Sequence, residues 1–357
     1  MSQASSNKKL ILVIGGTGVQ GSKPSANGEG SPYAIRVLTR NPEGRRALEL
    51  KAKGVELVKG TVDDFSSVLN ALEGVYGVYV NTDSTTLGEK RETFIGIRIF
   101  ELAKQVKTVR HYVWSNLEYN TKISGYNPEY AAEHLDGKGR VGDFLFQQAS
   151  EPTETSMSWT QLTTGPYMDM LFHPFIGPMN KRADGTYVFT SPIGDGHMPM
   201  VSLRDIAYFA RYIFDHRVET SGKDLRIASD DVTWDYLVRT FTKVTGKPAV
   251  YLRQSIDEWW TNWDGADRPY AAMDAHEKVT PNTNTLRKNF TKWWAIYRDN
   301  LSQRDFKWIR SVNPEAHTVE SWMRENNYTG DLNVRSLLKL EEDTGFVTPN
   351  FESVSRL

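Results

Sequence analysis

The residues with the clearest chemistry form a glycine-rich segment near the N-terminus, Gly15-x-x-Gly18-x-x-Gly21. They come directly after an apolar run, residues 10–14, of the kind typical of a buried parallel strand. Glycines at this point let the backbone turn tightly and approach a pyrophosphate, which the N–H groups and the positive end of the next helix would bind. A glycine-rich surface turn is the alternative, and the motif alone does not decide between the two.

A second candidate for phosphate chemistry is Arg40, at the C-terminal end of an expected strand, residues 32–40. In dinucleotide-binding folds an acidic residue here binds the ribose 2′-OH of NAD, whereas an arginine accommodates the 2′-phosphate of NADP. Arg40 therefore indicates NADP(H). A surface arginine that merely follows a strand is the alternative.

Polar side chains also end two later expected strands, residues 75–82 and 109–116. Thr82 and Asp83 follow the first of these strands, and Ser115 lies at the end of the second. Ligands of parallel α/β sheets bind at the carboxyl ends of the strands. These three side chains are therefore expected at one edge of the sheet, where a cofactor would lie.

Asp63 and Asp64 follow a further expected strand, residues 55–60. At this place a side chain commonly lies near an adenine. The two aspartates also directly precede an expected helix, residues 66–73, so capping of that helix is at least an equal interpretation.

The elements that must position these residues alternate along the chain. An amphipathic helix is expected over residues 89–106, with Phe94 among its inward-facing apolar residues. Strands and helices at this spacing predict an α/β fold with a doubly wound parallel Rossmann sheet. Residues 22–31 depart from the pattern, because Pro, Gly and Ser stand where a crossover helix should lie. Either the first helix is very short or a loop replaces it.

Composition narrows the function classes. The chain has 357 residues, a net charge of −1 and no cysteine. We therefore expect neither a nucleic-acid partner nor a membrane surface, and disulfides, thiol nucleophiles and Cys-ligated metals are excluded. No metal-spaced cluster of His, Asp and Glu is present, so no metal is expected. Without a signal peptide or a run of about 18 apolar residues, the expected location is cytoplasmic, with the nucleus as the alternative.

The second half of the chain is predicted to build the substrate side of the protein. A sixth strand is expected over residues 158–165, followed by a loop-rich stretch, residues 168–200, that forms either a pocket wall or ordinary core. Ser202 is expected to cap a helix over residues 203–216. We predict a Rossmann domain over 8–165, a smaller α+β substrate and lid region over 166–328, interleaved with the end of the sheet, and a peripheral tail over 329–357.

Several features beyond residue 220 leave alternatives open. Two short strands, 225–229 and 249–253, frame a helix that starts at Asp231 or Thr233 and ends at Gly246. A long loop or lid is expected over 264–286, and a helical patch over 332–343. An aromatic cluster forms either core or dimer packing or, alternatively, an aromatic substrate site. Its members are Trp259, Trp260, Trp263, Trp293, Trp294, Tyr297, Trp308 and Trp322.

Four segments together resemble the NmrA-like family of atypical short-chain dehydrogenase/reductases. They are GGTGVQG at 15–21, VLTRNP at 37–42, HYVWSN at 111–116 and HLDGKG at 134–139. The resemblance covers roughly residues 8–328. It implies an NADP(H)-binding Rossmann fold, and the family includes both reductases and redox-sensing regulators with little or no turnover.

The resemblance also implies site residues. Lys138 would bond the nicotinamide ribose, and Tyr167 and Met168 would line the nicotinamide pocket. Ser115 matches the usual catalytic serine position, with a plain strand-end hydroxyl as the alternative. The implied cofactor contacts are Gly15, Thr17, Gly18, Val19, Gln20 and Gly21 at the pyrophosphate, Arg40 at the 2′-phosphate, and Thr82 and Asp83 along the cofactor.

One departure from the family pattern concerns the proton donor. Active short-chain dehydrogenases carry Tyr-x-x-x-Lys, with the tyrosine as general acid. Here His134 stands four residues before Lys138, and Tyr130 lies one helical turn earlier still. A histidine can donate a proton near neutral pH, although an apolar-flanked histidine is more often structural. Pro128 and Gly137 argue against one continuous helix that includes Tyr130.

Two functions follow from these features. The first is an NADP-dependent atypical short-chain dehydrogenase/reductase that reduces a small apolar or aromatic carbonyl or enone, with Lys138, His134 and Ser115 as catalytic candidates. The second is a non-catalytic NADP(H)-sensing regulator that binds a protein partner or forms a homodimer. A scaffold without nucleotide binding is the third reading, if residues 22–31 have broken the phosphate site.

Overall fold

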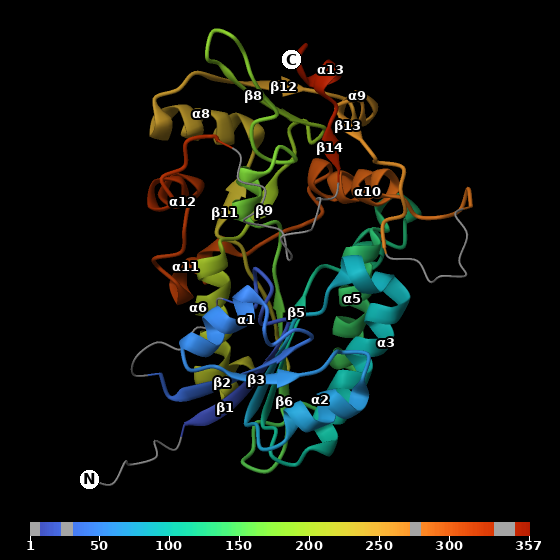
Figure 1. Cartoon of the computed structure of the whole chain (residues 1–357), viewed down its shortest axis with the longest axis vertical. Coiled ribbons are helices and arrows are strands. Elements are labelled where there is room, and N and C mark those ends of the chain that lie inside the picture. Colours follow the sequence, from blue (N-terminus) through green and yellow to red (C-terminus); the bar gives the residue numbers. More distant parts are fainter. Residues whose placement is uncertain (1–7, 23–30, 272–279, 332–346) are drawn as a thin grey trace.

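The computed structural model describes residues 8–22, 31–271, 280–331 and 347–357. Its centre is a seven-stranded parallel sheet in the order β10-β6-β5-β4-β1-β2-β3 (Figure 1). The order reverses beside β1, and ligands of such sheets bind at the carboxyl ends next to this reversal. The predicted doubly wound Rossmann sheet is confirmed. Its strands are β1 (Lys9–Ile14), β2 (Tyr33–Thr39), β3 (Glu56–Lys59), β4 (Gly77–Val80), β5 (His111–Asn116), β6 (Ser158–Thr163) and β10 (Asp224–Arg226).

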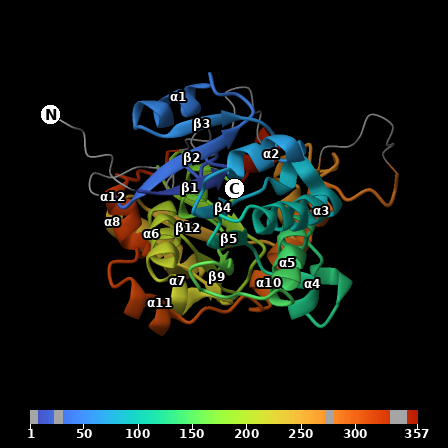
Figure 2. The same ribbon diagram turned by 90° about the horizontal axis from the view of Figure 1, so that it is seen from below.

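Helices cover both faces of the sheet (Figure 2). The helices α2 (Phe65–Leu72), α3 (Ser84–Gln105) and α5 (Glu133–Phe146) pack on one face. The helices α1 (Arg45–Ala52) and α6 (Leu203–Asp215) pack on the other. The central strands β1 and β4 are almost entirely apolar because both faces of the sheet are buried under helices there.

Two helices differ from their predicted form. The helix α3 begins at Ser84, five residues earlier than predicted (89 − 84), and Gly88 kinks it with a φ of 69°. The prediction that Phe94 faces inward is wrong, because its side chain is 58% exposed and meets Phe65 of α2 edge-on at the surface. The helix α5 continues through Gly137, whereas Tyr130 lies outside it in a short 3₁₀ helix, η1 (Pro128–Tyr130).

Helix caps agree with the sequence at four places. Ser202 accepts a hydrogen bond from the Asp205 N–H at the start of α6. Thr233, rather than Asp231, caps α8 (Trp234–Thr245), and Gly246 ends that helix in the left-handed conformation. Asp64 caps α2, which confirms its capping role.

The remaining elements form a second lobe beyond the carboxyl ends of the main sheet (Figure 1). Three small sheets organise it: β12-β8-β7, β11-β9 and β13-β14. The strands predicted over 225–229 and 249–253 do not pair with each other, because β10 joins the main sheet and β12 pairs with β8. The bounds are β7 (Asn180–Lys181), β8 (Tyr187–Ser191), β9 (Met198–Met200), β11 (Asp230–Val232), β12 (Ala249–Arg253), β13 (Trp263–Asp264) and β14 (Thr348–Pro349).

Short helices complete the chain. Among them, α10 lies beside the start of α5 and α11 beside α6 (Figure 1). Their bounds are α4 (Asn120–Ile123), η2 (Met168–Phe172), α7 (Arg217–Thr220), α9 (Ile256–Trp260), α10 (Leu286–Arg298), α11 (Phe306–Val312), α12 (Val319–Glu325) and α13 (Phe351–Val354).

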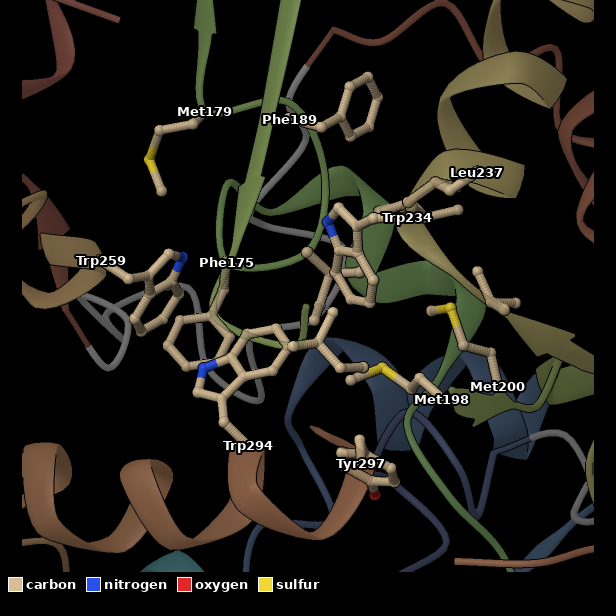
Figure 3. Packing of buried hydrophobic residues seen from close by; sticks show 14 of the residues in the cluster. Phe175, Met179, Phe189, Met198, Met200, Trp234, Leu237, Trp259, Trp294 and Tyr297 are labelled. Carbon is tan, nitrogen blue, oxygen red and sulfur yellow. The ribbon is translucent and has the colours of Figure 1, made fainter. Parts of the chain in front are cut away.

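Seven of the eight residues of the aromatic cluster are core, whereas Trp308 is half-buried and packs against Phe209 of α6. Phe175 stacks on Trp294 with ring centroids 5.8 Å apart and meets Trp259 edge-on at 4.7 Å (Figure 3). Trp259, Trp260 and Trp294 are each at most 2% exposed. Rings enclosed in this way stabilise the lobe by burying large apolar surfaces, so these side chains do not form an open substrate site.

Some predictions fall on residues that the structure does not describe. The helical patch expected over 332–343 lies outside the described residues, as do positions 23–30 of the irregular stretch and 272–279 of the expected loop. In the part of the chain that is described, no helix combines the length and hydropathy that crossing a bilayer requires.

Candidate functional site

The glycine-rich segment after β1 forms a tight turn that only glycine can make. Gly15 has a φ of 80°, and a Cβ atom there would lie 2.3 Å from the Asn81 carbonyl oxygen. A Cβ atom at Gly21 would lie 2.2 Å from the Gly15 carbonyl oxygen. The Gly18 N–H donates to this same oxygen at 3.0 Å and closes the turn. The turn therefore lies directly against the end of β4, at the reversal of strand order.

The outer side of the turn offers donors for an anion. The backbone N–H groups of Thr17 and Val19 make no hydrogen bond to the described residues. Arg46 of α1 donates to the Thr17 carbonyl oxygen at 3.4 Å, so a guanidinium lies beside the turn. Arg40 is exposed at the end of β2 and makes no hydrogen bond or ion pair within the described residues. These donors fit a phosphate group.

The Gln20 side chain points inward from the same turn. Its Nε2 donates to Ser115 Oγ at 2.6 Å and to Tyr79 Oη at 2.7 Å, while its Oε1 accepts from Tyr167 Oη at 2.6 Å. Burial raises the pKa of Tyr79 to about 12. Gln20 thus joins the glycine turn to β4, to β5 and to the segment after β6, and it brings Ser115 and Tyr167 together.

Lys138 lies at the centre of the site on α5. It is 5% exposed, and its Nζ donates to the Thr82 carbonyl oxygen at 3.0 Å, to Thr82 Oγ1 at 3.1 Å and to Asn81 Oδ1 at 3.2 Å. The Ser115 carbonyl oxygen is 3.4 Å away, and Glu92 Oε1 is 3.3 Å away. The ammonium is therefore held at the carboxyl ends of β4 and β5.

The glycines on either side of Lys138 let α5 pack closely enough for the lysine to reach the ends of β4 and β5. A Cβ atom at Gly139 would lie 2.4 Å from the Tyr119 Cα, and one at Gly137 would lie 2.9 Å from Glu92 Oε2. Side chains at either position would push α5 away from its neighbours. The Gly-Lys-Gly pattern thus reflects close packing around the lysine.

Two predicted residues face other partners. Asp83 caps α3, accepting from the Thr85 N–H at 3.3 Å and from Thr85 Oγ1 at 2.7 Å. Met168 is completely buried in the apolar core of the second lobe, and its N–H donates to the Val201 carbonyl oxygen at 2.9 Å. In the structure, Asp83 therefore stabilises the start of α3, and Met168 is part of the apolar core beside the site.

His134 lies one turn before Lys138 but contacts the second lobe. Its Nδ1 accepts from Asn289 Nδ2 at 2.9 Å, which leaves the proton of the neutral ring on Nε2. The rings of Phe290 and Tyr270 lie 5.3 and 5.7 Å from the imidazole. Desolvation lowers the pKa of His134 to about 4. The imidazole is therefore neutral at neutral pH.

The burial of His134 predicts that the folded protein is less stable at acidic pH. The unfolded chain binds a proton at the ordinary histidine pKa of 6.5, whereas the folded His134 does so near pH 4. The unfolded state thus binds more protons between these values, and the free energy of unfolding falls as the pH drops through this window. In His134→Phe we expect the loss between pH 7 and pH 4 to be smaller by about 2–3 kcal/mol. Urea unfolding at pH 7, 5.5 and 4 would measure it.

The control for this prediction is His216→Phe, because His216 is exposed on the surface. Its unfolding at the same three pH values measures the effect of replacing an exposed histidine by phenylalanine. An unchanged pH dependence in His134→Phe would show that the imidazole is not kept neutral by its surroundings.

Three residues of the site are absent from the sequence prediction: Asn81, Glu92 and Arg46. Asn81 directly precedes the predicted Thr82, so strand-end position alone could have indicated it. Glu92 and Arg46 lie within helices and come to the site only through packing between elements.

Comparisons with known proteins identify the family and the fold of this chain. Residues 7–264 match the model of the NmrA-like family. An NmrA-like family domain-containing oxidoreductase of Malbranchea aurantiaca, malD, is 26% identical over 306 residues, which cover 81% of this chain and 86% of that protein. The NAD(P)H azoreductase of Xenophilus azovorans is 27% identical over 76% of this chain and 86% of its own length.

Solved structures show the same fold. NmrA, a negative transcriptional regulator solved in complex with NAD, superposes with a TM-score of 0.68 at 19% identity, covering 89% of this chain and 95% of that one. The NADPH-dependent quinone oxidoreductase QOR2 of Escherichia coli, solved with NADPH, gives a TM-score of 0.66 at 18% identity, covering 89% of this chain and 99% of that one. With the family model matched over most of its length, this chain belongs to the NmrA-like family.

Proposed function

We propose that this protein binds NADP(H) at the carboxyl edge of its parallel sheet and reduces a small apolar or aromatic carbonyl or enone. The observation that carries this proposal is the position of Lys138. Its ammonium is held by Thr82 and Asn81, next to the glycine turn and at the reversal of strand order. A buried lysine at this edge is placed to bond a ribose that extends from the turn.

The residues present fit the proposed cofactor. The glycine turn has no space for a Cβ atom at Gly21, and the N–H groups of Thr17 and Val19 have no partner within the described residues. Arg40 would bind the 2′-phosphate and favour NADP over NAD, while Arg46 lies beside the glycine turn. Structural neighbours support a nicotinamide dinucleotide at this fold, because QOR2 was solved with NADPH and NmrA with NADP and with NAD, and the choice of NADP rests on Arg40.

In this mechanism the bound cofactor supplies the hydride. Lys138 would hold the ribose hydroxyls and orient the nicotinamide toward the substrate. The Ser115 hydroxyl, whose oxygen accepts from Gln20 and so keeps its own hydrogen for donation, or the neutral His134 Nε2–H would hydrogen-bond the substrate oxygen. Either group would relay to that oxygen a proton taken up from water, so that its own protonation state is restored. Tyr167, bonded to Gln20, would hold the glycine turn against the second lobe.

Arg40→Ala tests the choice of cofactor. The guanidinium would contact the 2′-phosphate, which NADH lacks, so affinity for NADPH should fall by about 10–100-fold while affinity for NADH stays the same. Isothermal calorimetry with both nucleotides would measure this. Arg324→Ala removes an exposed arginine that pairs with Glu320 on α12, and it should change neither affinity. Failure of the wild type to bind either nucleotide would overturn the proposed function.

One observation favours the second candidate, an NADP(H)-sensing regulator that binds a protein partner or a second copy of this chain. Position 134 carries a histidine where active short-chain dehydrogenases carry a tyrosine, and its ring is enclosed by Tyr270 and Phe290. NADPH oxidation with a panel of quinones and enones would separate the candidates, with His134→Tyr tested beside the wild type. Tight NADPH binding without turnover in both proteins would favour the regulator.

A further inference from the structure

A buried carboxylate lies directly behind Lys138. Glu92 of α3 is 0% exposed, and its Oε1 is 3.3 Å from Lys138 Nζ. The same oxygen accepts a hydrogen bond from Thr82 Oγ1 at 2.6 Å. Removing two charges from water is strongly unfavourable unless they are paired and hydrogen-bonded. Separating Glu92 from Lys138 would therefore leave a buried charge without a partner, which is unfavourable.

The hydrogen bonds around this pair have a fixed direction. Because the Thr82 hydroxyl donates its hydrogen to Glu92, its oxygen is left to accept from Lys138 Nζ, 3.1 Å away. Glu92 thereby acts on the ammonium twice, through its charge and through Thr82. Asn81 and Ser115, at the ends of β4 and β5, supply further acceptors around Nζ, so the ammonium lies at that edge of the sheet.

Glu92 is packed against the lysine even though one oxygen of the Glu92 carboxylate has no hydrogen-bond partner within the described residues. Glu92 Oε2 is buried and makes no hydrogen bond within the described residues. A Cβ atom at Gly137 would lie only 2.9 Å from Oε2, so the glycine before Lys138 is what admits the carboxylate. An unsatisfied buried polar atom lowers stability, which makes packing alone a poor reason for a glutamate at this place.

We propose that Glu92 is a positioning residue that keeps the Lys138 ammonium aimed at the nicotinamide half of the bound nucleotide. This inference rests on the proposed function, since it assigns a task toward the nucleotide that Lys138 would contact. It predicts that Glu92 strengthens the binding of the nicotinamide half of NADPH and has no effect on the binding of the adenosine half. The adenosine and its 2′-phosphate would lie at Arg40 after the end of β2, whereas Lys138 is held at the ends of β4 and β5.

The test compares two ligands on the full chain. Adenosine 2′,5′-bisphosphate carries the 2′-phosphate and the adenosine but lacks the nicotinamide ribose, whereas NADPH carries both halves. In Glu92→Gln, which keeps the shape and removes the charge, affinity for NADPH should fall about tenfold or more while affinity for the bisphosphate stays at the wild-type value. Glu92→Asp should recover part of the loss. Calorimetry would measure both ligands, and a thermal melt without ligand would check the fold.

Glu89→Gln is the matched control, because Glu89 lies on the same helix but pairs with Arg140 at the surface. It should change neither affinity. Equal weakening of both ligands in Glu92→Gln, or wild-type affinity for NADPH, would overturn the inference while the proposed function stands. A wild-type protein that binds neither ligand would overturn the proposed function itself.

Discussion

Lys138→Met is expected to abolish NADPH binding and to lower the free energy of unfolding by about 3–5 kcal/mol. The methionine has a similar length but carries no charge and no donor. Glu92 would then remain fully buried without a counter-charge, and the acceptors on Thr82 and Asn81 would lose their shared donor. Breaking one partner of a buried pair is far more damaging than replacing both.

A double variant separates the two expected losses. In Lys138→Met/Glu92→Leu both charges are absent and the space is filled by apolar side chains, so most of the stability should return. Nucleotide binding should not return, because the ribose would still lack its donor. Urea unfolding and calorimetry on the two single variants and the double variant would measure the coupling. If the double variant is no more stable than Lys138→Met, the unpaired Glu92 charge is not the cause of the lower free energy of unfolding in Lys138→Met.

The parts of this fold that the sequence predicts are those set by local pattern. The run Leu10–Ile14 followed by Gly15 predicts a buried strand and a turn, because apolar periodicity and glycine conformation act over a few residues. Ser202, Thr233 and Gly246 mark helix ends for the same reason, as their side chains or backbone conformations act on the adjacent turn.

The burial of Glu92, Phe94 and His134 depends instead on contacts with elements that are distant in the sequence. A helical pattern places all three on α3 or α5 but does not say which neighbour meets which face. Glu92 is buried because α5 approaches α3 at Gly137, while Phe94, two residues later, meets Phe65 at the surface. His134 is neutral because the rings of Tyr270 and Phe290 enclose it and exclude water. No motif around residue 134 contains that information.

The glycine turn gives the second large expected effect. Gly21→Ala should abolish NADPH binding, because its Cβ atom would lie 2.2 Å from the Gly15 carbonyl oxygen and 2.7 Å from the Gly15 carbonyl carbon. Both are backbone atoms that cannot rotate away, so the turn must open. The N–H groups of Thr17 and Val19 would then lose the arrangement in which they can share one phosphate. We expect NADPH affinity to fall by more than about 100-fold, which corresponds to roughly 3 kcal/mol.

Gly18→Ala provides the comparison within the same turn. Its Cβ atom would meet a single atom, the Gly15 carbonyl oxygen, at 3.2 Å, which a small shift can relieve. Without nucleotide, Gly18→Ala should melt close to the wild type, whereas Gly21→Ala should melt lower. Calorimetry with NADPH and thermal melts of both variants measure the two effects. Wild-type NADPH affinity in Gly21→Ala would show that the nucleotide binds elsewhere, since a pyrophosphate on this turn requires the close approach of residues 15 and 21.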